Sequence, residues 1–443
     1  MRETRTAQQR IFQSETDHEI ARELKRMSDW LDDHPELLDL VAQDVRSHKG
    51  STRGRGGMTI DTILRCAILK QYRQVDYRTL AFYLRDSVSF VEFARLEPGR
   101  GPSKSTLQTL ISAIRPQTWE ALHRCVLADA KERDVESGEM IRVDATVTDT
   151  AILEPSDSGL LYDSVRVMVR LLKAARVYGD VVFHNHQRKA KRRRYAIMNA
   201  RTNDRRRPLY ASLLQVTLDT LGYLEEVYKV LQKQSDTQSW RAEVDRYSPL
   251  ILQVIAQTQR RIIDGERVPA GDKIFSLFEP HTDLIVKGGR DVQYGHKLTL
   301  SSGASGLVLD VIVEEGNRAD SHCLIPLLER HIVCYGQPPR DLAADGGYAS
   351  AKNLADAKDL GVTNVAFHKR VGLTVEAMTG DRWLYKKLRN FRAGIEVVIS
   401  YLKRCFGLRR CNWKGLDHFK AYVQSAVFTH NLLVLTQRLK SSG

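Results

Sequence analysis

The chain has 443 residues, of which 42% are hydrophobic and 28% charged, which is typical of a globular protein with two or three domains. Its 68 Lys and Arg exceed its 54 Asp and Glu, and the net charge of +14 favours a polyanionic partner, either nucleic acid or an anionic membrane surface. No apolar run approaches the roughly 18 residues of a membrane-spanning helix, so nucleic acid is the favoured partner and no membrane association is expected.

The first segment, residues 1–57, is predicted to be a polar helical lead-in followed by a basic linker. Its first twenty residues carry charges throughout and lack the apolar core of a secretory signal, so we expect a cytoplasmic protein. Pro35 interrupts the helical pattern. The Gly- and Arg-rich stretch 51–57 is typical of a flexible connection.

The six cysteines lie far apart along the chain. None forms a C-x-x-C pair, and none lies beside a spaced histidine pair. A zinc site and a disulfide framework are therefore both improbable, and ordinary thiols are expected.

Residues 58–135 are predicted to form a helical N-terminal domain. A Gly/Pro break at 98–102 separates two groups of amphipathic helices, and Ser103 or Ser105 could cap the helix that follows. Short helices joined by polar turns resemble helix-turn-helix material, which would contact DNA and could bind a DNA end. The alternative is a small helical cluster that binds nothing.

The period changes at residues 139–153, which are predicted to form a strand. Side chains alternate there and β-branched residues are frequent. Asp144 lies where the hydrophobic strand gives way to polar residues. A carboxylate at a strand end can serve chemistry, since ligands bind beyond the strand ends of α/β sheets, or it can be a turn residue.

Residues 155–270 read as a long block of helices with a basic run between the first two. In residues 188–207, ten of twenty side chains are Lys or Arg and one is Asp. Such a run is either a solvated face or a phosphate-binding segment, and its density favours phosphate. His184 and His186, in the loop before it, are expected to face solvent or phosphate rather than a metal ion. The predicted DNA-binding residues are Lys189, Lys191, Arg192, Arg193, Arg194, Arg205, Arg206 and Arg207.

Strands and helices alternate in the last segment, 272–438. A hairpin is predicted from 296–302 and 307–314, joined by a Gly/Ser turn. A helix, a strand ending in Asp345, a second helix and another strand follow, before two final helices.

The first of these final helices, 389–403, has two distinct faces. Phe391, Ile395, Val398 and Leu402 form an apolar stripe. On another face, Arg392 and Lys403 fall within roughly 40° of Glu396 at 100° per residue. Taken alone, this face is either a solvated ion pair or part of a site.

The order of elements predicts a mixed α/β sheet with helices on its faces. Neighbouring strands would bring Asp144 and Asp345 together, and a helix across the sheet could add Glu396. Three converging carboxylates repel one another unless divalent cations lie between them. Mg²⁺ prefers such oxygen ligands, and two ions about 4 Å apart suit phosphodiester chemistry. Three other acids compete for the two aspartate roles: Asp341 at the wrong strand end, Asp310 in mid-strand, and Asp149, expected past its strand.

These residues resemble the DDE transposases of bacterial insertion sequences. One large group carries a Tyr-x2-Arg-x3-Glu-x6-Lys signature, and Arg392, Glu396 and Lys403 match its last three positions. The tyrosine position holds Arg389, a departure that suggests a divergent branch. The DGGY run at 345–348 is similar to the family's second-aspartate motif, and the resemblance extends over about 53–435.

The resemblance implies a ribonuclease H-like core, with a helical N-terminal domain and a long helical insertion after the first catalytic strand. The implied enzyme is a metal-dependent polynucleotidyl transferase that cuts the element's ends and joins the 3′-hydroxyls to target DNA. Asp144, Asp345 and Glu396 would bind two Mg²⁺ ions, which Mn²⁺ could replace, and Arg392 and Lys403 would hold phosphate.

The implied partner is double-stranded DNA, comprising the terminal inverted repeats and the target. A homodimer in the DNA complex, at the bacterial nucleoid, is the expected assembly. Two alternatives remain: a structure-specific nuclease on the same fold, and a non-catalytic DNA-binding protein derived from a transposase.

Overall fold

The computed structural model describes residues 18–47, 57–287, 291–369 and 371–441. Residues 1–17 of the predicted lead-in, and 51–56 of the predicted linker, lie outside these ranges. The chain divides into two compact units. One comprises Met1–Asp149 and His296–Gly443, and the other comprises Thr150–Gly295.

The N-terminal part of the first unit is helical, and its first two helices belong to the core. Trp30 in the first helix is buried, and its Nε1 donates a hydrogen bond to Asp129 Oδ2 at 2.8 Å. The described part of the predicted polar lead-in is therefore an amphipathic, packed element. The helices are α1 (Glu19–Asp33), α2 (Leu37–Ser47), α3 (Ile60–Tyr72), α4 (Tyr77–Asp86), α5 (Val88–Phe93), α6 (Lys104–Ile111) and α7 (Pro116–Glu132).

Local sequence signals set the ends of several of these helices. Ser103, one of the two predicted caps, accepts a hydrogen bond from the Thr106 backbone N–H at 3.2 Å and so begins α6. Pro116 occupies the first turn of α7, where its missing N–H costs nothing. The break predicted at Pro35 falls between α1 and α2.

The sheet is mixed, as predicted. Its order is β2-β3-β1-β5-β6, with β4 also paired to β3. Strand β3 is long enough to pair antiparallel with β2 near its start and with β4 near its end, and the β3–β4 pair is the predicted hairpin. β5 is parallel to both β1 and β6. This order is consistent with a ribonuclease H-like core. The strands are β1 (Met140–Asp149), β2 (Asp283–Lys287), β3 (Asp291–Ser302), β4 (Val308–Val313), β5 (Asp341–Ala344) and β6 (Asn364–Phe367).

Strand β1 is longer than its hydrophobic part suggested. It continues past Asp144 and ends at Asp149, which was expected to lie beyond the strand. The reason is long-range backbone pairing. The Asp149 N–H donates to the Arg409 carbonyl at 3.1 Å, and the Cys411 N–H donates to the Asp149 carbonyl at 2.8 Å.

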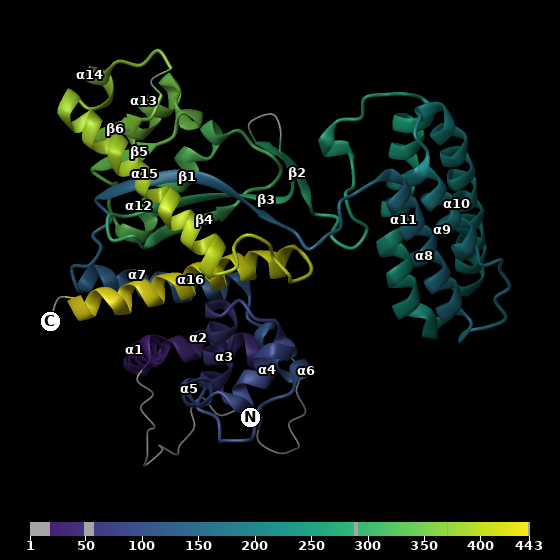
Figure 1. The fold of residues 1–443 in the computed structure, drawn as a ribbon, viewed down its shortest axis with the longest axis horizontal. Coiled ribbons are helices and arrows are strands. Elements are labelled where there is room, and N and C mark those ends of the chain that lie inside the picture. The colour runs from purple at the N-terminus through teal and green to yellow at the C-terminus, as the bar shows by residue number, and fades with distance from the viewer. Residues whose placement is uncertain (1–17, 48–56, 288–290, 370, 442–443) are drawn as a thin grey trace. The chain divides into compact units, whose positions relative to one another are not determined.

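Helix α15 (Arg382–Cys405) lies across the sheet and contacts β1, β5 and β6 (Figure 1). It begins seven residues before the predicted 389–403 because Asp381 caps it, accepting from the N–H groups of Trp383 at 3.0 Å and Leu384 at 3.2 Å. The other helices of this part are α12 (Leu324–Tyr335), α13 (Ala351–Asp359), α14 (Val375–Met378) and α16 (Leu416–Ser441).

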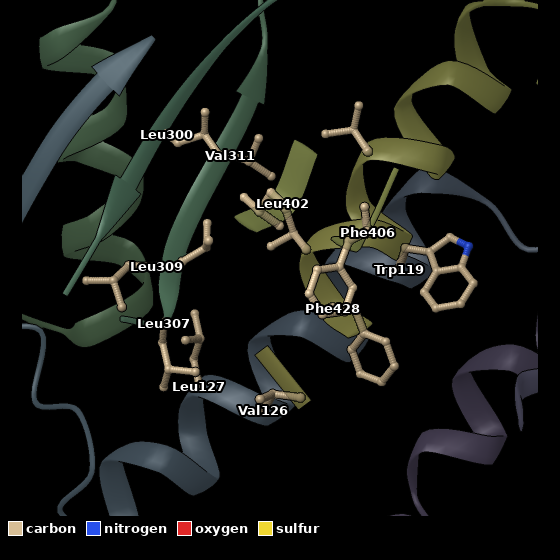
Figure 2. Packing of buried hydrophobic residues seen from close by; sticks show 14 of the residues in the cluster. Trp119, Val126, Leu127, Leu300, Leu307, Leu309, Val311, Leu402, Phe406 and Phe428 are labelled. Atoms are coloured by element: carbon tan, nitrogen blue, oxygen red, sulfur yellow. The ribbon is translucent and has the colours of Figure 1, made fainter. Parts of the chain in front are cut away.

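The apolar stripe of α15 faces the core, as predicted. Ile395 and Leu402 are fully buried and Val398 nearly so. Figure 2 shows Leu402 and Phe406 among side chains of the β3–β4 hairpin, α7 and α16. A helix whose apolar stripe is fixed in this way has its charged face fixed too.

The second unit contains a four-helix group with its own hydrophobic core. The basic run, expected as a loop between two helices, is itself helical over most of its length. The expectation of a loop is wrong here because Ala190 and Ile197 are buried and give the run an apolar side. The helices are α8 (Asp157–Ala175), α9 (Gln187–Asn199), α10 (Asn203–Leu231) and α11 (Gln238–Thr258).

Short helical turns complete the two units. Among the helices that the structure describes, none has the length and apolar composition to span a bilayer. The turns are Ser235–Thr237, Gln259–Ile263, Ala270–Asp272, Asp320–His322 and Gly346–Tyr348.

Candidate active site

Two of the predicted carboxylates lie at the same place on neighbouring strands. The parallel pairing of β1 with β5 runs from Met140 opposite Asp341 to Val143 opposite Ala344. The next residue along the chain is Asp144 within β1 and Asp345 directly after β5. The register therefore brings these two side chains to one edge of the paired region.

Arg392 of α15 connects these two aspartates to Glu396. Its Nη1 lies 3.6 Å from Asp144 Oδ2 and 3.9 Å from Asp345 Oδ1, and its Nη2 lies 2.8 Å from Glu396 Oε1. The Arg392 side chain is only 11% exposed. At Arg392, the charged face of α15 is therefore shielded from solvent. It meets the strand ends.

The three carboxylates differ in exposure. The exposed fraction of the side chain is 22% for Asp144, 45% for Asp345 and 64% for Glu396. Three carboxylates and one guanidinium carry a formal charge of −2. The four groups thus form an open, acidic site that can accept further positive charge.

The donor chemistry of this site fits a divalent cation. Carboxylate oxygens are hard ligands of the kind Mg²⁺ prefers. Within the described ranges, no three Asp, Glu, His or Cys side chains are already grouped closely enough to hold an ion. The Arg392 guanidinium is the group that all three carboxylates share. Its Nε is buried and has no hydrogen-bond partner in the described structure, so the guanidinium is not fully satisfied where it lies.

The turn after Asp345 requires its two glycines. A Cβ on Gly346 would lie 2.8 Å from Lys369 Cβ, and one on Gly347 would lie 2.6 Å from Asp320 Oδ2, closer than Cβ atoms approach other atoms. Tyr348 is completely buried. Burial raises its pKa, and the negative charges of Asp320 and Asp144 raise it further.

Asp320 is a neighbour of the site that sequence reasoning missed. It packs against Gly347, forms an ion pair with the buried Lys297, and has a side chain 32% exposed. No motif marked it, because it begins the short helical turn Asp320–His322 before α12. The available signal was the pair of glycines at 346–347, since adjacent glycines imply that something approaches the backbone closely.

Lys403 acts at a different place from Arg392. It is seven residues beyond Glu396, about 10 Å along the helix axis at 1.5 Å per residue. Its charge acts on Asp149 at the end of β1. Burial raises the pKa of Asp149, while Lys403, Arg410 and Arg409 act in the opposite direction.

Two of the competing aspartates have structural partners. Asp310 lies within β4, and its two oxygens accept hydrogen bonds from Arg330 at 2.5 and 2.7 Å. Asp341 begins β5, at the opposite end of the strand from Asp345, and accepts from Asn364 Nδ2 at 2.7 Å. These partners leave Asp144 and Asp345 as the better-placed pair.

Arg389, at the signature's tyrosine position, faces a different environment from Arg392. Its guanidinium lies 5.8 Å from the ring centre of Tyr385. Both side chains line a cavity of about 570 Å³ next to His368, which follows β6. The departure from the signature therefore adds a cation one helical turn before Arg392.

The cations of the basic run, which are the predicted DNA-binding residues together with Arg188 and Arg201, fall into two groups. On α9, Arg188, Lys189, Lys191 and Arg192 are exposed, on sides of the helix away from Ala190 and Ile197. Among the described residues, none of the cations of α9 forms an ion pair with a carboxylate. These side chains are therefore available to an external polyanion.

In the second group, three side chains are held by the protein. Arg206 Nε donates to the Ala200 carbonyl at 2.9 Å, and Arg207 Nη2 donates to the Ile263 carbonyl at 2.5 Å. Arg194 lies over the ring of Tyr162 at 5.6 Å. Arg193 is half-buried on α9, and Arg205 is exposed near the start of α10.

The two histidines before α9 have different surroundings, so the expectation that both face solvent or phosphate is wrong for one of them. His184 is exposed. His186 is 8% exposed, and its Nδ1 lies 3.0 Å from Thr220 Oγ1. Burial lowers the pKa of His186, with a further lowering by His184.

Comparison with known proteins gives one result for this chain. Residues 256–432 match the family model described as a transposase DDE domain. The matched segment contains Asp345, Arg392, Glu396 and Lys403 but not Asp144. A search of curated proteins found no match, and neither did a search of solved structures. The match covers the segment that contains α12, α15 and five of the six described strands, and it supports a DDE transposase of the insertion-sequence type.

Proposed function

We propose that this protein cuts DNA at the ends of its insertion sequence and joins the exposed 3′-hydroxyls to target DNA. The observation that supports the proposal best is the convergence of Asp144, Asp345 and Glu396 on Arg392, each within 4 Å of its guanidinium. These carboxylates come from two adjacent strands and one helix. An arrangement assembled from such distant parts of the chain is costly unless it has a use, since three like charges repel.

In this proposal the three carboxylates hold two divalent ions, Mg²⁺ or in its place Mn²⁺. When bound, the ions supply activation of the attacking oxygen and stabilisation of the leaving oxygen. Water first attacks a phosphorus atom at the element's end, and the P–O bond that breaks releases a 3′-hydroxyl. That hydroxyl then attacks a target phosphodiester, which forms one bond and releases one target 3′-hydroxyl.

Arg392 has the position to bind the DNA phosphate during both steps. Its guanidinium is nearly buried and carries a Nε with no partner in the described structure. Transferred from the carboxylates to a non-bridging phosphate oxygen, it would stabilise the charge that develops in the transition state. We assign Lys403 to the same DNA strand further along, two helical turns beyond Glu396.

DNA binding outside the catalytic site is assigned to α9 and to the N-terminal helices. The exposed cations of α9 would contact phosphates, and α6 presents Lys104, Ser105 and Gln108 to solvent as a helix that could contact the element's end. Two ends must be joined in concert, so a homodimer in the DNA complex is part of the proposal. The reaction would take place at the bacterial nucleoid.

The test is a cleavage and strand-transfer assay with the element's own terminal repeats in Mg²⁺ or Mn²⁺. We expect Asp345→Asn to abolish both activities while leaving end binding within about two-fold, because the carboxylate is half exposed and supports no core packing. Asp359→Asn, an exposed acid at the end of α13, is the matched control and should retain full activity.

The outcomes separate the alternatives. Cutting without joining would favour a structure-specific nuclease. End binding by the wild-type protein without any metal-dependent cleavage would favour a non-catalytic DNA-binding protein. Cleavage by Asp345→Asn at the wild-type rate would show that the site is misassigned.

A further inference from the structure

Helix α15 approaches β1 unusually closely at Gly394. This glycine lies in the helix interior, between Arg392 and Glu396 in the sequence. A Cβ at this position would overlap Arg142 Nη1 and would lie 2.7 Å from its Cζ. Real Cβ atoms do not approach other atoms so closely, so the guanidinium occupies the space of the missing side chain.

Arg142 is buried and is held on two sides. Its Nε donates to Ser302 Oγ of β3 at 2.8 Å, and its Nη1 donates to the Phe391 carbonyl of α15 at 3.2 Å. Its guanidinium also lies 4.8 Å from the centre of the Phe391 ring. The side chain therefore joins the sheet to the backbone of α15.

The position of this contact matters because of its neighbours. Arg142 precedes Asp144 by two residues on β1, so both side chains point to the same face of the sheet. Gly394 is two residues from both Arg392 and Glu396. The contact thus lies between the strand that carries the first carboxylate and the helical turn that carries the third.

We infer that Arg142 and Gly394 form an interlock that sets the rotation and height of α15 over β1, and so positions Arg392 and Glu396 relative to Asp144. The inference rests on the proposed function of that site. Arg142 touches none of the reacting groups in this arrangement and is a positioning residue, not a catalytic one.

The helix itself gives no reason for a glycine at this point. Alanine is the better helix former, so Gly394→Ala should stabilise α15 if nothing lay against it. Gly222, in the interior of α10, has nothing within 4 Å of the position that a Cβ would take, and it supplies the matched control. The structure therefore predicts opposite results for the same substitution in two helices.

The experiment compares Gly394→Ala, Gly222→Ala, Arg142→Lys and the double variant Gly394→Ala/Arg142→Lys. We measure end binding, the single-turnover cleavage rate on bound ends, the Mg²⁺ concentration for half-maximal rate, and the thermal unfolding midpoint. Gly394→Ala should lose at least about 100-fold in cleavage rate and need more Mg²⁺, with end binding unchanged. Gly222→Ala should match the wild type in end binding, cleavage rate and Mg²⁺ requirement. It should unfold at the same or a slightly higher temperature.

The double variant is the decisive arm. Lysine lacks the Nη1 atom that the new Cβ would meet, but it keeps the positive charge. The double variant should therefore cleave at least about ten-fold faster than Gly394→Ala. The double variant should also lower the unfolding midpoint by less than the sum of the two single substitutions. If Gly394→Ala fails to fold, Arg142→Lys alone must still slow cleavage and raise the Mg²⁺ requirement at unchanged end binding.

Wild-type cleavage by Gly394→Ala, or a double variant no better than Gly394→Ala, would overturn the interlock. Glu396→Gln distinguishes this failure from failure of the proposed function. If Glu396→Gln is inactive while Gly394→Ala is fully active, the site stands and only the interlock is wrong. If Glu396→Gln cleaves normally, the site itself is misassigned.

Discussion

Helices α15 and α9 both carry dense charge, but the protein uses the two charged faces differently. On α15, Arg392 is 11% exposed and contacts three carboxylates. On α9, Arg188 and Lys189 are exposed, and the cations of that helix form no ion pair among the described residues. The difference teaches that a buried cation shared by acids is committed to partners within the protein, whereas exposed cations without a carboxylate partner stay available to an external polyanion.

The largest expected effect comes from removing the negative charge of Glu396 on α15. Glu396→Gln keeps the size of the side chain and removes its charge. We expect metal-dependent cleavage to fall by at least about 1,000-fold with end binding within two-fold, because the proposed function assigns this carboxylate to a metal ion and its side chain is 64% exposed. A single-turnover cleavage assay measures the first quantity and gel-shift titration the second. A comparable loss of end binding would contradict a purely catalytic role.

The next largest effect concerns Arg392. Arg392→Lys keeps a cation but cannot reach all three carboxylates in the geometry of a planar guanidinium. We expect a loss of about 100-fold in cleavage rate, and a larger loss for Arg392→Ala. Arg389→Lys, one turn earlier and beside Tyr385, is the control and should cost less than about ten-fold. Equal losses at the two positions would mean that α15 carries a general phosphate contact and not a specific one.

For α9 we expect a binding effect with little effect on chemistry. Replacing Arg188, Lys189 and Arg192 by Gln should weaken DNA binding and reduce the salt slope, d log K/d log[salt], by about 0.9 for each phosphate that is no longer neutralised. The cleavage rate of fully bound DNA should stay within two-fold. Replacing Arg206 and Arg207, which are held by backbone carbonyls, should change the slope less.

The assignment of Arg193 and Arg194 to DNA is tested in the same assay. Together with Arg192, these residues form three consecutive arginines of the basic run, but Arg194 is engaged by Tyr162. We expect most of the effect of a triple substitution at 192–194 to come from Arg192. If the exposed α9 variant leaves the salt slope unchanged, the helix does not belong to the DNA interface.

The smallest expected effect is a pH dependence of folding stability, which should arise beside α15 and not at α9. His430 packs edge-on against Tyr401 of α15 and is 1% exposed, and burial lowers its pKa to about 4. A lowered pKa in the folded state means that the unfolded chain takes up the proton first as the pH falls. Stability is therefore lost from about pH 6.5 down to about pH 4, by at most about 3.4 kcal/mol at 1.36 kcal/mol per pKa unit.

Denaturant unfolding at pH 7, 6 and 5 measures this loss. His430→Gln cannot titrate, so its stability should fall less over this range than that of the wild type. The α9 variants keep His430, so they should show the wild-type pH dependence. Parallel curves for His430→Gln and wild type would show that this histidine is not the group responsible.

The sequence by itself determined several elements and the resemblance to a family. Period-2 and period-3.6 patterns predicted β1, the β3–β4 hairpin and α15, because local patterning decides which side of each element is buried. The spacing of Arg392, Glu396 and Lys403 pointed to a DDE transposase, and the family match agrees. The roles of the individual residues remain predictions.

Only the tertiary structure decided what those residues touch. The register of β1 against β5 placed Asp144 beside Asp345, and it depends on pairing between residues about 200 positions apart. Long-range pairing with Arg409 and Cys411 also extended β1 to Asp149. Packing of Ala190 and Ile197 turned an expected loop into α9.

The same reason explains why Arg142 and Gly394 were invisible in the sequence. A strand arginine and a helical glycine carry no signal until the chain folds and puts one in the space left by the other. Local sequence sets which surfaces are apolar or charged. Which surfaces meet, and how closely, is set by contacts between distant segments that no local pattern encodes.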